Sequence, residues 1–245
     1  AYIPNIHFFQ VGRADSAVPL DDCDGQWTIC TPETAAEFSA VGFFFGRELS
    51  HKLNVPIGLI HSSWGGTPSE AWTSPEALKE FPDFKKRIEK LEDRERYQYP
   101  SVLYNGMIHP LIPYTIKGVI WYQGESNAYD PELYAKIFPA MIRDWRKLWD
   151  IGNFSFYFVQ IAPFAYEEGK DALGLRQVQL DAMKVRNTGM VVTIDIGDLN
   201  TIHPANKEEV GKRLALWALA KNYGFDSLVC SGPIYRDKII ERSHI

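Results

Sequence analysis

Cysteine is scarce in this chain, and its few copies show no metal-binding pattern. The 245 residues include three cysteines, and no Cys-x-x-Cys pair or Cys/His cluster has the spacing of zinc ligands. We therefore expect no structural metal and no cofactor. Cys23 and Cys30 flank a short loop and can form a disulfide in an oxidising compartment. A bridge between them and free thiols both remain open.

The chain also lacks a long apolar run and an excess of positive charge. No stretch of about 18 apolar residues, the length needed to span a bilayer, occurs in it. The formal net charge is -5, whereas phosphate binding needs a concentrated basic surface. The sequence therefore predicts no membrane span and no nucleic-acid partner.

What the chain does have is enough apolar material for a sizeable core. Hydrophobic residues make up 45% and charged residues 23%, as in an ordinary folded protein. Strand-like and helix-like segments alternate, which predicts an α/β fold with a mostly parallel sheet covered by helices on both faces. No internal repeat or linker interrupts this pattern, so one domain over residues 1–245 is the simplest interpretation.

Five apolar runs of strand length support this prediction. They cover residues 6–11, 56–61, 116–122, 154–161 and 190–196. Helices are expected at 31–49, 131–149, 175–185 and 204–223, because apolar residues recur there at helical spacing. In the last of these, Pro204 would occupy the first helical turn.

Two of the predicted strands run into polar turns that contain candidate site residues. Ligands bind at the carboxyl ends of strands in open parallel sheets. The turn at 62–67 contains Gly65 and Gly66, whose backbone N–H groups can approach a developing negative charge. The turn at 121–127 contains Gln123, a candidate oxyanion donor, with Glu125 and Asn127 as supporting groups. Such polar groups are costly to bury without partners, although Glu125 would also suit a structural ion pair.

A third polar turn follows the predicted strand at 190–196. It contains Asp198 and Asn200 and delivers His203 to the start of a helix. A histidine with an acid or amide close upstream can act as a general base with an orienting group. Together the three turns supply an oxyanion site and a base, which is the equipment of acyl transfer.

A convincing nucleophile is missing from this set. The chain contains no Gly-x-Ser-x-Gly motif. Ser62, Ser63 and Ser126 lie near the predicted site, but none stands alone at a sharp turn from strand to helix. The site is therefore incomplete in these residues.

Four segments are informative in combination. They read PIGLIHSSWGGT at 56–67, GVIWYQGESN at 118–127, IHP at 202–204 and RLALWA at 213–218. Together they strongly resemble the sialate O-acetylesterase family, which belongs to the SGNH (GDSL-like) hydrolases. The resemblance covers nearly the whole chain.

The resemblance implies a flavodoxin-like α/β/α sandwich of three layers and hydrolysis of acetyl esters on sugars, typically O-acetylated sialic acid. It implies that His203 is the base and that Gly65 donates a backbone N–H to the oxyanion. Gln123 stands where many SGNH hydrolases have an asparagine donor. The family's aspartate three residues before the histidine is Asn200 here. Asp198 is then the candidate acidic partner, and the alternative is a Ser–His dyad whose imidazole is oriented by Asn200 or a backbone carbonyl.

The resemblance also locates the missing nucleophile. The family's Gly-Gln-Ser-Asn segment follows the first central strand and would fall just upstream of Tyr2. Without that strand, the segments at 57–61 and 116–122 would expose unpaired N–H and C=O groups in a buried sheet. We hypothesise that a second chain or another segment supplies both the serine and the central strand.

Two alternative functions share these features. A carbohydrate-binding relative that lost its nucleophile would use Trp64, Trp72 and Trp121 for stacking on sugars. An acetylxylan esterase would share the chemistry and differ in its sugar pocket. The resemblance further implies a secreted or periplasmic location, which a Cys23–Cys30 bridge would suit.

Overall fold

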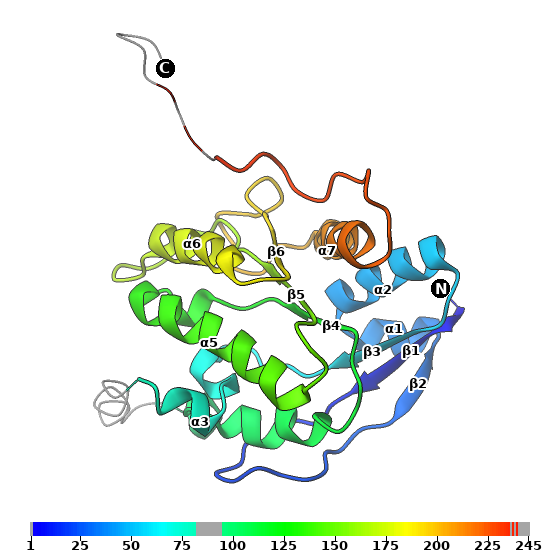
Figure 1. The fold of residues 1–245 in the computed structure, drawn as a ribbon, viewed down its shortest axis with the longest axis horizontal. Helices are drawn as coiled ribbons and strands as arrows, with labels where there is room; N and C mark the ends of the chain where they lie inside the picture. Colours follow the sequence, from blue (N-terminus) through cyan, green and yellow to red (C-terminus); the bar gives the residue numbers. More distant parts are fainter. Residues whose placement is uncertain (1, 82–94, 236, 238, 240–245) are drawn as a thin grey trace.

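The computed structural model describes residues 2–81, 95–235, 237 and 239, and it confirms the predicted α/β architecture. Helices lie on both sides of the strands (Figure 1). One side is covered by α2 (Ala40–Leu53) and α7 (Lys207–Asn222), and the other by α5 (Pro131–Trp149) and α6 (Ala172–Asp181). In the described residues, no helix combines the length and the apolar character needed to cross a bilayer.

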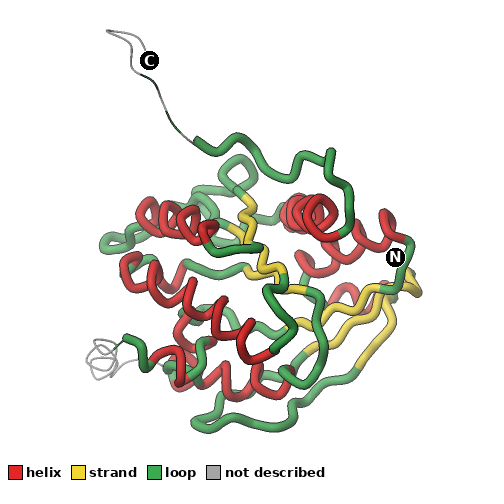
Figure 2. The backbone as a smooth tube through the Cα atoms, in the orientation of Figure 1, coloured by secondary structure: helices red, strands yellow, loops and turns green. Residues whose placement is uncertain are grey.

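The strands form two separate sheets of three strands each. In the first, β1 (Ile3–Gln10) lies between β2 (Trp27–Cys30) and β3 (Ile57–His61). In the second, β5 (Ser155–Val159) lies between β4 (Gly118–Trp121) and β6 (Thr188–Val191). The β1–β2 pair is antiparallel and the other pairs are parallel. Figure 2 shows the two groups of strands between the helices.

Strand β5 marks the middle of the three layers. All five of its residues are buried. Phe156 and Phe158 pack into the cluster that contains α5, whereas Tyr157 and Val159 pack into the cluster that contains α7. This alternation follows from the two-residue period of a strand, and it places helices on both faces of the sheet.

Strands β3 and β4 differ from β5 in their burial. Each is an outer strand of its sheet, and four of their apolar residues are only half-buried: Ile57, Ile60, Val119 and Ile120. Strands that are buried on both faces are usually continuous apolar runs, and β3 and β4 have that composition. Their sequence is therefore that of inner strands, although each lacks a neighbour on one side in the described structure.

Local capping sets where the helices begin and end. The helix expected at 31–49 is two helices, α1 (Pro32–Glu37) and α2, because Ser39 accepts a hydrogen bond from the Gly42 N–H and starts a new helix. Helix α7 begins at Lys207 and not at Pro204, because Asn206 caps it by accepting from the Glu209 N–H. The predicted start of this helix was therefore wrong by one turn.

Two strand predictions also need correction. Strand β2 was not predicted, because it is a four-residue edge strand within a polar stretch. The strand expected at 190–196 is β6 and ends at Val191. The chain leaves the sheet there, and Thr193 bonds instead to the carbonyl of Gln160. Among the described residues, the other helical segments are α3 (Pro75–Leu78) and short turns at Ser69–Trp72, Arg96–Gln98, Tyr104–Ile108, His109–Leu111, Glu125–Asn127 and Ala182–Lys184.

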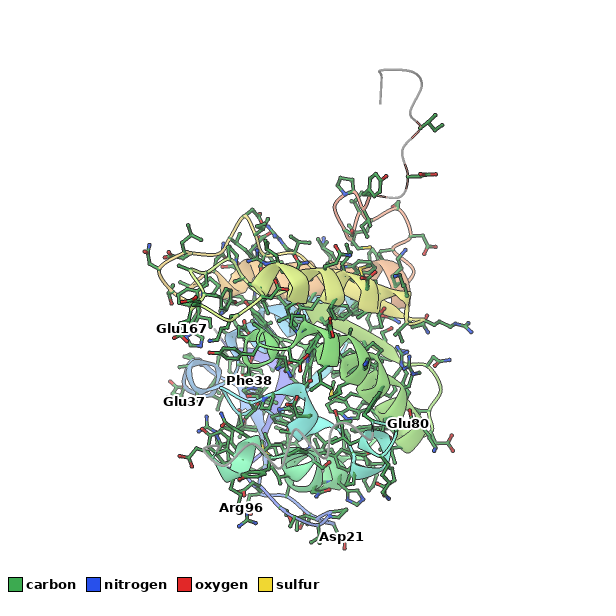
Figure 3. The ribbon with its side chains drawn as sticks, turned by 90° about the vertical axis from the view of Figure 1, so that its left-hand side faces the viewer. Asp21, Glu37, Phe38, Glu80, Arg96 and Glu167 are labelled. Atoms are coloured by element: carbon green, nitrogen blue, oxygen red, sulfur yellow. The ribbon has the colours of Figure 1, made fainter. Side chains whose placement is uncertain are left out.

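Charged side chains lie on the surface, and the cysteines form no disulfide in the described residues. Figure 3 shows the charged side chains of Asp21, Glu37, Glu80, Arg96 and Glu167 around the outside of the molecule. None of the three cysteines takes part in a disulfide in the described part of the chain, so Cys23 and Cys30 are not bridged there. Burial raises the pKa of both of these thiols.

Arg146 fixes α5 to the chain on either side of it. Its guanidinium is buried and donates to the carbonyls of Phe154, Arg186 and Asn187, at distances between 2.7 and 3.0 Å. Buried carbonyls that lose a charged donor remain unsatisfied, which is costly. Arg146 therefore bonds α5 to the chain just before β5 and just before β6.

We expect Arg146→Met to lower the free energy of unfolding by about 3 kcal/mol, because three buried carbonyls lose their donor. Arg143→Met, an exposed arginine of the same helix, is the matched control and should change it by less than about 0.5 kcal/mol. Urea unfolding followed by circular dichroism measures both. Equal midpoints for the two variants would contradict the assigned role.

Candidate functional site

A cavity of about 1080 Å³ lies between β3 and β4. Residues of both strands line it, together with the turns at their carboxyl ends. His203 from the third polar turn also lines it, as do Gly65, Gln123 and Glu125. The structure therefore brings residues from the three predicted turns to one place.

The two broad walls of the cavity are apolar. One wall comes from α2 and α7 and includes Val41, Phe45, Leu49, Leu214 and Ala218. The opposite wall includes Trp72, Ile108, Leu111, Trp145 and Trp149. The narrow sides are the outer backbone edges of β3 and β4, so the cavity has strand edges on two sides and apolar walls on the other two.

The side chain of Asn127 connects the first two turns. Its Oδ1 accepts from the Ser69 N–H at 2.8 Å and from Gln123 Nε2 at 2.7 Å. Its Nδ2 donates to Glu70 Oε2 at 2.8 Å. Asn127 and Glu70 are both buried, so these bonds form away from water. This network fixes the turn after β4 against the turn after β3.

Gln123 is held on both sides. Its Nε2 donates to the Thr67 carbonyl at 3.1 Å as well as to Asn127, so both amide hydrogens have partners. The backbone carbonyl of Gln123 accepts a hydrogen bond from Gln179 Nε2 at 3.2 Å. Gln123 Oε1, in contrast, is buried and has no partner in the described structure. Gln123 therefore lines the cavity with both of its side-chain N–H groups bonded and its buried Oε1 without a partner.

The paired glycines are open toward the cavity. Added Cβ atoms at Gly65 and Gly66 would contact nothing within 4 Å, so packing does not require glycine there. Gly66 has a φ of +74°, a conformation that side chains disfavour. Thr67 stabilises the turn by donating to the Trp64 carbonyl, and Trp72 Nε1 donates to Thr67 Oγ1. The Gly65 backbone is thus accessible and held in place.

A second histidine makes a hydroxyl contact beside this turn. His61 Nε2 lies 2.7 Å from Ser63 Oγ, and His61 Nδ1 lies 2.7 Å from Gln10 Oε1. Burial lowers the pKa of His61, and the nearby Arg13 lowers it further. Ser62 is occupied differently, since its hydroxyl donates to the Met107 carbonyl. Ser63 and His61 therefore form the one Ser–His contact among the described hydrogen bonds.

Asp198 and Asn200 bond to each other. Asp198 Oδ1 accepts from the Asn200 N–H at 2.8 Å and from Asn200 Nδ2 at 3.1 Å. The His203 N–H donates to Thr201 Oγ1. These bonds shape the loop that presents His203, but none of them reaches the imidazole.

The charge of His203 acts on the carboxyl group of Glu125. His203 is exposed and lines the cavity, and the buried Pro204 follows it. Burial raises the pKa of the Glu125 carboxyl, while its own N–H, Lys207, His203 and the Gly124 N–H counteract that shift. Lys207 Nζ lies 5.1 Å from the centre of the Tyr122 ring, which brings the start of α7 against the turn after β4.

Three supporting residues were not predicted from the sequence. Gln179 is fully buried on α6 and donates to the Gln123 carbonyl, and a glutamine on an apolar helix face was the available signal. Glu70 and Lys207 lie among ordinary surface-type sequence, which gave no signal. Among the described residues, no group of three His, Cys, Asp or Glu side chains could hold a metal ion.

Comparison with known proteins places this geometry in a family. Residues 24–220 match the family model described as carbohydrate esterase, sialic acid-specific acetylesterase. Sialate O-acetylesterases of Homo sapiens and Pongo abelii are each 39% identical over 94% of this chain, and the one of Rattus norvegicus is 35% identical. The chain spans about half the length of these relatives, 49% for the first two.

Solved structures agree with this assignment. A carbohydrate acetylesterase from Xanthomonas citri superposes with a TM-score of 0.86 and 39% identity, over 96% of this chain and 52% of that one. An Arabidopsis thaliana protein, 21% identical with a TM-score of 0.59 over 90% of this chain and 83% of that one, shares the fold alone. The family match and the relatives confirm the resemblance seen in the sequence: this chain belongs to the sialic acid-specific acetylesterase family of carbohydrate esterases.

Proposed function

We propose that this chain forms the main part of an enzyme that removes O-acetyl groups from sugars, with O-acetylated sialic acid as the first candidate substrate. One observation carries the proposal. His203, the open Gly65 turn and Gln123 line one cavity at the carboxyl ends of two strands. A base and an oxyanion site that meet in this way suit acyl transfer. The names of the relatives support the substrate class.

The proposal includes a serine from a segment outside these 245 residues. In the proposal, this segment lies as a strand between β3 and β4. Buried backbone N–H and C=O groups need partners, and an inserted strand would pair with both edges. The two apolar walls would accept its side chains on both faces, as expected for an inner parallel strand. The half-burial of β3 and β4, beside the complete burial of β5, supports the same location.

The direction of this strand follows from the neighbouring turns. The Gln123–Thr67 bond joins the residues that follow β4 and β3, so the carboxyl ends of these strands lie together. A strand parallel to both would end at the same place, beside His203 and Gly65. A serine just after its last residue would then face the base and the oxyanion site.

Ser63 is a weaker candidate for the nucleophile. Its histidine, His61, has a lowered pKa because of burial and Arg13, so it resists the proton that a general base must take. The third member, Gln10, carries no charge and cannot stabilise an imidazolium. The Ser63–His61–Gln10 chain of bonds is better suited to holding the turn that contains Gly65.

The reaction then proceeds in two steps. The serine oxygen attacks the acetyl carbon as its proton passes to His203, and the oxyanion accepts from the Gly65 N–H and the serine's own N–H. Gln123 joins by exchanging its longer bond, to the Thr67 carbonyl, for the oxyanion. His203 protonates the departing sugar oxygen. It then takes a proton from the water that attacks the acetyl-serine, and it returns this proton to the serine oxygen as that ester bond breaks and acetate leaves.

His203→Ala should lower kcat/KM on an aryl acetate by about 10³-fold or more, because no other group near the site replaces the base. His51→Ala is the matched control, an exposed histidine of α2 outside the cavity. Steady-state esterase assays compare the two variants with the parent. Turnover retained by His203→Ala would overturn the assignment of the base.

Gln123→Ala should lower kcat by about 10²–10³-fold with a smaller change in KM, because an oxyanion donor acts mainly in the transition state. Gln98→Ala tests the alternative that any bond to this turn suffices, since Gln98 Nε2 donates to the Gly66 carbonyl at 2.8 Å. It should cost less than about 5-fold. Equal losses in the two variants would remove Gln123 from the reaction.

A fluorophosphonate probe should label one serine in protein isolated from its natural source, and peptide mapping should place that serine outside these 245 residues. An activated serine reacts because its base removes the hydroxyl proton. Label on Ser63 would contradict the proposed origin of the nucleophile. A complete absence of label would contradict the esterase and favour a carbohydrate-binding protein.

A further inference from the structure

An arginine without an acidic partner in the described structure lies beside the proposed site. Arg13 is exposed, and its Cζ lies 5.4 Å from the centre of the Trp64 ring. Trp64 lines the cavity and directly precedes Gly65, the proposed oxyanion donor. Among the described residues, no carboxylate forms an ion pair with Arg13, and the acid nearest in sequence, Asp15, pairs with Arg96 at 2.7 Å. One ring therefore separates an available guanidinium from the glycine turn.

Strand β1 brings Arg13 to this edge of the sheet. It pairs in parallel with β3, and the Val11 N–H donates to the His61 carbonyl where both strands end. The carboxyl ends of parallel strands meet at one edge, so the chain after β1 leaves the sheet beside the turn that contains Gly65. Burial lowers the pKa of His61, and the charge of Arg13 lowers it further, which places the guanidinium near the last residue of β3.

The loop that carries Arg13 is tightly packed on both sides. The Gly12 N–H donates to the Asp24 carbonyl at 2.8 Å, and an added Cβ at Gly12 would lie 2.8 Å from Asp24 Cβ. On the other side, an added Cβ at Gly106 would collide with the Ala14 carbonyl. A backbone fixed in this way loses little entropy when its side chain binds a ligand.

The aromatic ring under Arg13 is also supported. Tyr97 stacks on Trp64, with 4.6 Å between the ring centres and 9° between the planes. The next residue, Gln98, donates to the Gly66 carbonyl at 2.8 Å. A cation–π contact orients a guanidinium without using its N–H donors. The donors of Arg13 therefore remain available for a ligand.

The lysines that line the cavity are less well placed to bind an anion. They are Lys117, Lys170 and Lys207. Lys170 pairs with Glu167 at 3.8 Å, and the charge of Lys207 acts on the Glu125 carboxyl. Lys117 precedes β4, so it lies at the end of that strand opposite to the proposed site. An anionic group of a ligand that reacts at the glycine turn would therefore meet Arg13.

We propose that Arg13 binds the carboxylate of an acidic sugar whose O-acetyl group lies at the Gly65 turn. The proposal rests on the esterase function above and adds a specificity-determining residue to it. A planar guanidinium donates two parallel N–H groups to a carboxylate, which fixes the orientation of the sugar. The chain has a net charge of -5 and repels anions at a distance, so an acidic substrate needs such a local cation. Sialic acids and uronic acids both carry this carboxylate.

The first test measures selectivity for the carboxylate, with every variant made in the complete protein. Release of acetate is compared for O-acetylated N-acetylneuraminic acid and for its methyl ester, which has lost the negative charge. The parent should prefer the acid. Arg13→Gln should lower the ratio of kcat/KM for the acid to kcat/KM for the ester by about 10-fold or more, chiefly through KM, because a charged hydrogen-bond pair is lost.

Two further variants define the contact. Arg13→Lys keeps the charge and loses the planar fork, so its ratio should lie between those of the parent and Arg13→Gln. Arg143→Gln, at an exposed arginine of α5, is the matched control and should keep the ratio of the parent.

A second test measures binding without turnover. In calorimetry, N-acetylneuraminate should bind the parent more tightly than its methyl ester does, and Arg13→Gln should weaken the binding of the acid by about 10-fold. Galacturonate in the same assay separates the two sources of the carboxylate. Binding of either acid that depends on Arg13 supports the proposal, and the acid that binds more tightly identifies the class of sugar.

Three results would overturn the proposal. They are a parent that treats acid and ester alike, an Arg13→Gln variant that keeps the preference for the acid, and equal losses on acid and ester in that variant. Hydrolysis of an aryl acetate by a parent without this preference would retain the esterase and reject the role of Arg13. Binding that depends on Arg13 in a protein that releases no acetate would retain the carboxylate site and reject the proposed function.

Discussion

The side-chain amide of Asn127 holds together the two halves of the molecule at the site. Strand pairing does not join β3 to β4 in the described structure, so their turns need another connection. Asn127 provides it by accepting from Ser69 and Gln123 and donating to Glu70. Because these hydrogen bonds are buried, breaking one of them costs more free energy than breaking a hydrogen bond on the surface. The spacing between the Gly65 turn and Gln123 depends on them.

The two histidines near the cavity show how environment decides function. His61 is half-buried, lies near Arg13 and bonds to two neutral groups, so its neutral form is favoured. His203 is exposed at the mouth of the same cavity, and its charge acts on the Glu125 carboxyl. General acid–base chemistry needs a group that can change state near neutral pH. Proximity to a hydroxyl alone would have pointed to His61 and not to His203, the proposed base.

The sequence predicted the fold class, four of the six strands closely and α5 to the residue, because these segments have strong periodicity or unambiguous caps. It missed β2 and the break at Ser39, where short-range capping outweighs the apolar pattern. It named the turns that meet at the cavity, since strand ends are visible in sequence. It could not reveal that Asp198 bonds to Asn200, or that Gln179 supports Gln123, because these contacts depend on how α6 and the loops pack.

The outer edges of β3 and β4 affect how readily the protein aggregates. Two parallel backbone edges with apolar, half-buried side chains form a template for any extended chain nearby. A copy whose cavity stays unfilled is therefore the form most prone to self-association through intermolecular strand pairing. In the proposed assembly, a strand seated in the cavity would cover both edges and so protect the protein from aggregation.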